Sequence, residues 1–235
     1  MQLTNRLQKI ADSIEINERV ADIGTDHGYL PIYLYSEGIS REIIISDVNK
    51  GPMEIALKNI EIHIGKGHNI KSRIGNGLEV IGDNEADTVV IAGMGGLLIQ
   101  EILSKDIEKS RAIKKLILQP RNAQDKLRKW LTENGFKIID EHLAEEGRYI
   151  CEIIVATPGK SQSENNEIYY EIPKILIHKN DPLLKEFIKR KIKTEKAILM
   201  NTMNEDSLKA KKQSEYSEKR IHILEEVLKD VSKNK

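Results

Sequence analysis

The chain has 235 residues, 39% of them hydrophobic and 31% charged, which fits one globular domain plus an appendage. Its basic and acidic side chains balance at 37 each, so net charge gives no overall signal for nucleic acid. Charged residues interrupt the first 16 positions and no later stretch approaches the roughly 18 apolar residues of a membrane span, so we expect a cytoplasmic protein without a membrane partner.

Short β-branched runs alternate with helix-length segments through the first 160 residues. The runs cover 19–23, 43–46, 88–92, 115–118, 137–139 and 149–156, with a further short strand before Gly75. This alternation is typical of a parallel sheet covered on both faces. The last two runs, joined by a short connection containing Glu and Gly, indicate an antiparallel hairpin at the sheet edge. We therefore predict an α/β, Rossmann-like domain over residues 1–160, followed by a polar loop at 157–167.

Residues 161–235 are predicted to be a linker and a helical tail. Two sets of apolar residues mark helical faces, the second with the 3-4-3 spacing of a coiled-coil seam: Ile188, Ile192 and Leu199, then Ile221, Leu224, Leu228 and Val231. A polar turn at 201–206 would make them an antiparallel hairpin. From Asp181 onward, 14 Lys and Arg face 10 Asp and Glu, which leaves this segment at +4. The hairpin could contact nucleic acid, or pack against the sheet domain or a second subunit.

The first strand ends in a glycine-bearing turn that runs from Asp22 to Pro31 as Asp-Ile-Gly-Thr-Asp-His-Gly-Tyr-Leu-Pro. Gly24 and Gly28 let the backbone turn sharply and approach a ligand. Thr25 and Asp26 stand where the dinucleotide fingerprint has its second glycine, and acids there would repel a pyrophosphate. A cationic cofactor without phosphate, such as S-adenosylmethionine, fits this turn better.

The other strand ends carry polar residues and glycines as well. Asp47, about 20 to 25 positions after the first turn, is placed to accept hydrogen bonds from ribose hydroxyls. Asn76 can hydrogen-bond an adenine edge. The glycines of Gly93–Gly96 leave room for a planar base to meet a methyl donor, or they only start the next helix. Tyr29 could stack on a ligand or pack beneath the first helix.

Four segments together resemble the bacterial tRNA methyltransferases that modify N1 of the adenine at position 22. They are residues 22–31, Ser-Asp-Val-Asn at 46–49, Ala-Gly-Met-Gly-Gly at 92–96, and Leu-Gln-Pro-Arg with the following Leu-Arg-Lys-Trp-Leu at 118–131. The resemblance covers nearly the whole chain. It implies a class I methyltransferase domain over 1–160, S-adenosylmethionine as donor, S-adenosylhomocysteine as product, tRNA as acceptor, and a coiled-coil tail that helps grip the tRNA.

These considerations give a set of candidate site residues. The cofactor-binding candidates are Asp22, Gly24, His27, Gly28, Tyr29, Leu30, Asp47, Val48, Asn76, Gly77, Gly93 and Met94. The substrate-binding candidates are Gly95, Gly96, Gln119, Pro120 and Arg121. Adenine N1 has an in-plane lone pair and needs no base, so positioning is most of the catalysis. Asp26, with His27 beside it, is the candidate for stabilising the cationic product.

Other interpretations stay open at this point. The acceptor could be a protein or a small molecule, with the tail as a dimerisation hairpin, or the chain could be a non-catalytic RNA-binding module. We expect a monomer or a weak homodimer. The single cysteine, Cys151, excludes an internal disulfide and a thiolate zinc cluster, and its apolar flanks indicate a buried strand thiol. No metal is expected.

Overall fold

The computed structural model describes residues 1–202 and 207–233. The chain forms two compact units, Met1–Asn165 and Asn166–Lys235. Most of the predicted turn at 201–206 lies outside the described residues, and its first two positions are the last residues of a helix. No helix in the described ranges is long and apolar enough to cross a membrane.

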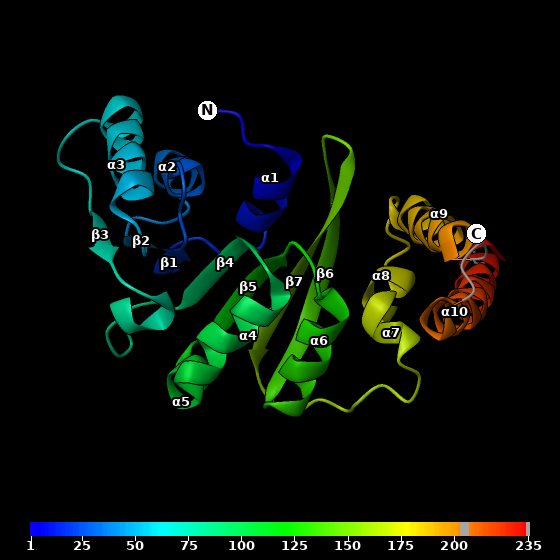
Figure 1. Ribbon diagram of the computed structural model, residues 1–235. Coiled ribbons are helices and arrows are strands. Elements are labelled where there is room, and N and C mark those ends of the chain that lie inside the picture. Colours follow the sequence, from blue (N-terminus) through cyan, green and yellow to red (C-terminus); the bar gives the residue numbers. More distant parts are fainter. Residues whose placement is uncertain (203–206, 234–235) are drawn as a thin grey trace. The chain divides into compact units, whose positions relative to one another are not determined.

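A seven-stranded sheet organises the first unit (Figure 1). Its strands are β1 (Val20–Ile23), β2 (Ile43–Asp47), β3 (Ile70–Ile74), β4 (Thr88–Met94), β5 (Lys115–Pro120), β6 (Phe136–Glu146) and β7 (Tyr149–Pro158). They lie in the order β3-β2-β1-β4-β5-β7-β6. The first five are parallel, and β7 runs antiparallel between β5 and β6. The predicted Rossmann-like sheet and its antiparallel edge hairpin are confirmed, although β7 extends two residues into the predicted loop.

Helices cover both faces of this sheet. One face carries α1 (Asn5–Ala11), α2 (Tyr29–Ser36) and α3 (Lys50–Ile64). The other carries the 3₁₀ helix η1 (Gly77–Val80), α4 (Gly96–Lys105), α5 (Ile107–Ala112) and α6 (Gln124–Glu133). Successive residues of β1 belong to opposite cores, with Val20 on the α1–α3 side and Ala21 on the α4–α6 side. Because both faces are buried, the inner strands are continuous apolar runs and do not alternate with polar residues.

A buried charge cluster joins α6 to the β6–β7 hairpin. Arg128 of α6 lies 2.6 Å from Glu141 of β6 and 2.7 Å from Glu152 of β7, and all three side chains are almost fully buried. Burial raises the pKa of Glu141, while the guanidinium opposes that shift. Losing the arginine would leave two carboxylates without their counter-charge in a site closed to water.

The second unit is helical, with α7 (Ile168–Glu171), α8 (Lys174–His178), α9 (Leu184–Thr202) and α10 (Leu208–Lys233). The antiparallel pair was predicted: Ser214 donates to Thr202 at 2.9 Å, and Lys196 lies 2.8 Å from Glu225 farther along. The short helices α7 and α8 were not predicted. Supercoiling of α9 around α10 stays a prediction.

Candidate active site

A cleft of about 940 Å³ opens at the carboxyl ends of β1, β2, β4 and β5. The strand order reverses here, because β1 has β2 on one side and β4 on the other. Open α/β sheets bind ligands at such a reversal. Other elements also border the cleft, namely α1, the tip of the β6–β7 hairpin and the first residues of α2 and α6. The volume lies near the upper end of the roughly 300–1,000 Å³ typical of ligand pockets, which leaves space for more than one ligand group.

The turn after β1 is held by hydrogen bonds to the neighbouring strand. The backbone N–H groups of Gly24 and Thr25 donate to the Ser46 carbonyl at 2.8 and 3.0 Å. Gly24 has φ of +76°, and a Cβ there would collide with Cε of Met94. Glycine therefore permits the turn and leaves room for the end of the Met94 side chain.

Asp22, the third residue of β1, is a buried carboxyl group that lines the cleft. Burial raises the pKa of Asp22 to about 6, opposed by a hydrogen bond that the Thr25 hydroxyl donates at 2.7 Å and by the charge of Arg6. Its ionisation is therefore sensitive to any cation that enters the cleft.

Three side chains of the same turn stand open to solvent. The Asp26 side chain is 75% exposed and lies 3.7 Å from Nε2 of His27. The His27 ring stacks on Tyr29 with ring centroids 5.5 Å apart and planes 19° from parallel. Tyr29 is exposed and lines the cleft, so the structure favours a ligand-facing position over packing beneath α2.

The loops after β4 and β5 are tied together across the cleft floor. The Gly93 N–H donates to Oε1 of Gln119 at 3.0 Å, and the Arg121 N–H donates to the Met94 carbonyl at 2.7 Å.

Asp47, at the end of β2, accepts a hydrogen bond from the Asn49 N–H at 2.8 Å, which orients its carboxylate.

The structure brings most of the sequence candidates together. Those that line the cleft are Asp22, Gly24, Asp26, His27, Tyr29, Leu30, Asp47, Gly93, Met94, Gln119, Pro120 and Arg121. Those that do not line it are Gly28, Val48, Asn76, Gly77, Gly95 and Gly96. Gly96 instead packs against the α6 side, where a Cβ would lie 2.6 Å from the Ala123 carbonyl oxygen. Asn76 is exposed and begins η1.

Sequence reasoning missed one wall of the cleft. This wall contains Thr4, Arg6, Leu7, Gln124, Glu146, Tyr149, Ile150 and Cys151. Arg6 and Glu146 form an ion pair across 140 positions of sequence, a separation that no local motif reports. The one local feature that could have pointed to this wall is a tyrosine, Tyr149, directly after the short Gly-Arg turn of the predicted hairpin. Cys151 was expected to be buried; it is half-buried in this wall, and burial and Glu146 raise the pKa of its thiol.

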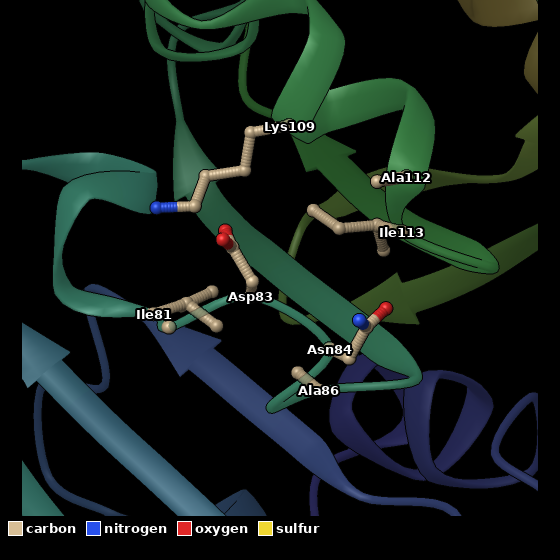
Figure 2. Close-up of a pocket in the computed structure, with 8 residues that line it drawn as sticks. Ile81, Asp83, Asn84, Ala86, Lys109, Ala112 and Ile113 are labelled. Atoms are coloured by element: carbon tan, nitrogen blue, oxygen red, sulfur yellow. The ribbon is translucent and has the colours of Figure 1, made fainter.

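A second cavity, of about 250 Å³, lies at the amino ends of β4 and β5, away from the carboxyl ends where the cleft opens. Figure 2 shows Asp83 and Asn84 of the loop before β4 on one side and Lys109 of α5 on the other. None of the candidate residues lines it. Within residues 1–202 and 207–233, no group of three or more His, Cys, Asp or Glu side chains is arranged to hold a metal ion.

Residues 20–226 match the family described as tRNA (adenine(22)-N(1))-methyltransferase. The chain is also 32% identical over 233 residues to the Bacillus subtilis tRNA (adenine(22)-N(1))-methyltransferase, covering 97% of this chain and 98% of the relative. The chain belongs to this family. The resemblance predicted from four sequence segments is thereby confirmed.

Solved structures of the family agree with the fold and identify ligands in relatives. The M. capricolum TrmK bound to S-adenosyl-homocysteine superposes with a TM-score of 0.81 at 29% identity, covering 98% of this chain and 99% of its own. A Streptococcus pneumoniae protein bound to S-adenosyl-L-methionine gives 0.85 at 29% identity over 97% of this chain and 100% of its own. These two relatives thus share this chain's fold along nearly its whole length.

Proposed function

We propose that this chain transfers the methyl group of S-adenosylmethionine to N1 of adenine 22 in tRNA and releases S-adenosylhomocysteine. The observation that carries the proposal is the single cleft at the strand-order reversal, which combines acidic loops with a wall bearing an aromatic ring and cations. Family membership supplies the target atom and nucleotide.

The β1 and β2 ends fit the cofactor by charge. When bound, S-adenosylmethionine supplies a methyl group on a sulfonium cation. Asp22 and Asp47 place carboxylates at adjacent strand ends, which favours a cation and a ribose diol over a pyrophosphate. We assign cofactor contacts to the cleft-lining residues Asp22, Gly24, His27, Tyr29, Leu30, Asp47, Gly93 and Met94. Gly28, Val48, Asn76 and Gly77, which the sequence also suggested as cofactor contacts, lie outside the cleft lining.

The acceptor side must present adenine N1 without donating a proton to it. N1 attacks through its in-plane lone pair, so alignment and exclusion of water carry most of the rate enhancement. The adenine leaves its stack to enter the cleft, at a cost of a few kcal/mol. Methylation makes the ring cationic. The Asp26 carboxylate, with His27 beside it, would stabilise that charge.

The helical tail is proposed to contribute tRNA backbone contacts. Lys189 and Lys193 are exposed one turn apart on α9. Neutralising phosphates with such lysines makes affinity fall as salt rises. Replacing both by Gln should reduce the slope of log affinity against log salt without changing cofactor affinity. A cytoplasmic location and a monomeric or weakly dimeric state stay predictions that accompany this proposal.

The test is methyl transfer from radiolabelled donor to tRNA that lacks the modification, followed by mass spectrometry of nuclease fragments. We expect label in tRNA and a methyl group on N1 of adenine 22. A transcript with guanine at position 22 is the matched control and should stay unlabelled. Label in protein or small molecules, and none in tRNA, would favour a methyltransferase that acts on a protein or small-molecule acceptor. Binding of tRNA and cofactor without label would favour the non-catalytic module.

A further inference from the structure

The tip of the β6–β7 hairpin directs two side chains into the cleft. Glu146 ends β6 and Tyr149 begins β7. The two residues pair directly at the tip, with only Gly147 and Arg148 between them. Directly opposed residues of antiparallel strands place their side chains on the same face. Both line the cleft, on the side away from the β2 and β3 ends.

Tyr149 presents a largely exposed aromatic ring, with the guanidinium of Arg148 over one of its faces. The residue is 60% exposed although it lines the cleft. The Arg148 guanidinium lies 5.0 Å from the ring centroid, and the arginine donates a hydrogen bond to the Tyr149 hydroxyl at 2.8 Å. Exposed tyrosine rings beside arginine cations are suited to unpaired nucleotides, since the ring stacks on a base and the cation attracts phosphate.

A chain of polar contacts holds this tip relative to the floor of the cleft. Arg6 of α1 forms an ion pair with Glu146 and also donates to Oε1 of Gln119 at 3.3 Å. The same Gln119 oxygen accepts the Gly93 N–H at 3.0 Å. The hairpin tip is therefore connected, through one arginine and one glutamine, to the end of β4 that is assigned to the methyl donor.

We propose that Tyr149 is the stacking platform for the adenine that receives the methyl group, and that Arg6 and Glu146 are positioning residues for it. This inference rests on the proposed function. Stacking engages the face of the base and leaves its edge uncovered, so the N1 lone pair stays available for attack. A hydrogen bond to N1 would instead occupy that lone pair. Stacking also offsets part of the cost of removing the base from the tRNA.

The central experiment compares Tyr149→Leu with Tyr149→Phe. Stacking lost in the leucine variant should lower kcat/KM for tRNA by about 10- to 100-fold, while the phenylalanine variant stays near the parent. Cofactor affinity by calorimetry should be unchanged in both. Tyr35→Leu is a control at a second tyrosine that has an arginine over its ring, Arg41 at 4.9 Å, but does not line the cleft. Because Tyr35 packs against the core, its kcat/KM is compared at a temperature where the variant is folded. Parent-like kcat/KM in Tyr149→Leu would refute the inference, as would a phenylalanine variant as weak as leucine.

A fluorescent base gives a readout that a purely structural defect would not produce. With 2-aminopurine at nucleotide 22, the complex of Tyr149→Leu should be brighter than that of Tyr149→Phe, because the unstacked base is no longer quenched. Equal brightness would contradict stacking. If the unaltered chain labels no tRNA, the proposed function fails. If it labels tRNA normally and the leucine variant does too, only this inference fails.

The positioning residues are tested by coupling. Arg6→Gln should lower kcat/KM for tRNA at saturating cofactor, a condition that removes any effect of the Arg6 charge on cofactor binding through Asp22. Adding this change to Tyr149→Leu should cost little more, because both changes remove the same placement of the ring. Arg19→Gln is the matched control. Arg19 pairs with Asp87 at 2.9 Å, at the amino ends of β1 and β4, so its replacement should leave kcat/KM unchanged. Fully additive effects of Arg6→Gln and Tyr149→Leu would overturn the positioning role.

Discussion

The two halves of the cleft are built in different ways. The donor half, formed by the turns after β1 and β2, consists of short loops whose shape follows from glycine and from hydrogen bonds to adjacent strands. The acceptor half is assembled from α1, the β5 end and the hairpin tip, which lie far apart in sequence and meet through charged side chains. Local backbone geometry therefore shapes the first half, whereas the second depends on contacts between segments far apart in sequence, namely an ion pair and the apolar packing of α1 on the hairpin. Mutations should affect them differently.

The largest effect is expected where the acceptor half depends on buried charge. Arg128→Met should lower the free energy of unfolding by about 3–5 kcal/mol, because Glu141 and Glu152 lose their counter-charge in a buried site. Urea denaturation measures this. Adding Glu141→Gln and Glu152→Gln should restore much of the loss. If Arg128→Met alone unfolds at the urea midpoint of the parent, the hairpin does not depend on this charge cluster, and buried charge does not distinguish the acceptor half from the donor half.

The donor half should respond most strongly to a change of backbone geometry. Gly24→Ala should weaken S-adenosylmethionine binding by roughly tenfold, since φ of +76° costs an L-residue about 1–2 kcal/mol and the new Cβ moves the flexible Cε end of Met94, which lines the cleft. Gly67→Ala is the matched control. Its φ is +89° but no atom lies within 4 Å of an added Cβ, so it should lose stability and keep cofactor affinity. Calorimetry distinguishes the two, and equal affinities would refute the steric argument.

The donor half could be predicted from the sequence and the acceptor half could not, because only the donor half is shaped by residues that are close together in the chain. The β1 turn could be predicted because the residues that shape it, Gly24 and Gly28, stand beside those that face the cleft. The wall carrying Arg6 and Tyr149 could not, because its geometry depends on a contact between α1 and a hairpin that no periodicity encodes. Helices α7 and α8, of four and five residues, are too short to show a helical repeat.

The charge of the donor half gives a pH test. Because burial raises the pKa of Asp22 to about 6, a cationic cofactor should bind about tenfold more weakly at pH 5 than at pH 7.5. The stability of the free protein should change in the opposite direction: a carboxyl group whose folded pKa is raised contributes most below its unfolded pKa near 4, and that contribution is lost as pH rises through about 6. In Asp22→Asn both slopes should flatten. Cofactor affinity that stays constant across this range in the parent would contradict the role of Asp22.

The smallest effect is expected at Asp26, a solvent-exposed residue of the turn after β1. Its side chain is 75% exposed, so water screens its charge, and we expect Asp26→Asn to lower kcat by only about 3- to 10-fold. Asparagine suits this test because Asp26 has φ of +51°, a conformation that Asn tolerates and most residues do not. KM for tRNA should change little, since the proposed role is toward the charge that develops on the methylated ring. A loss confined to KM would instead make Asp26 a binding residue, and the stabilising carboxylate would then have to come from the acceptor half, where Glu146 already stands.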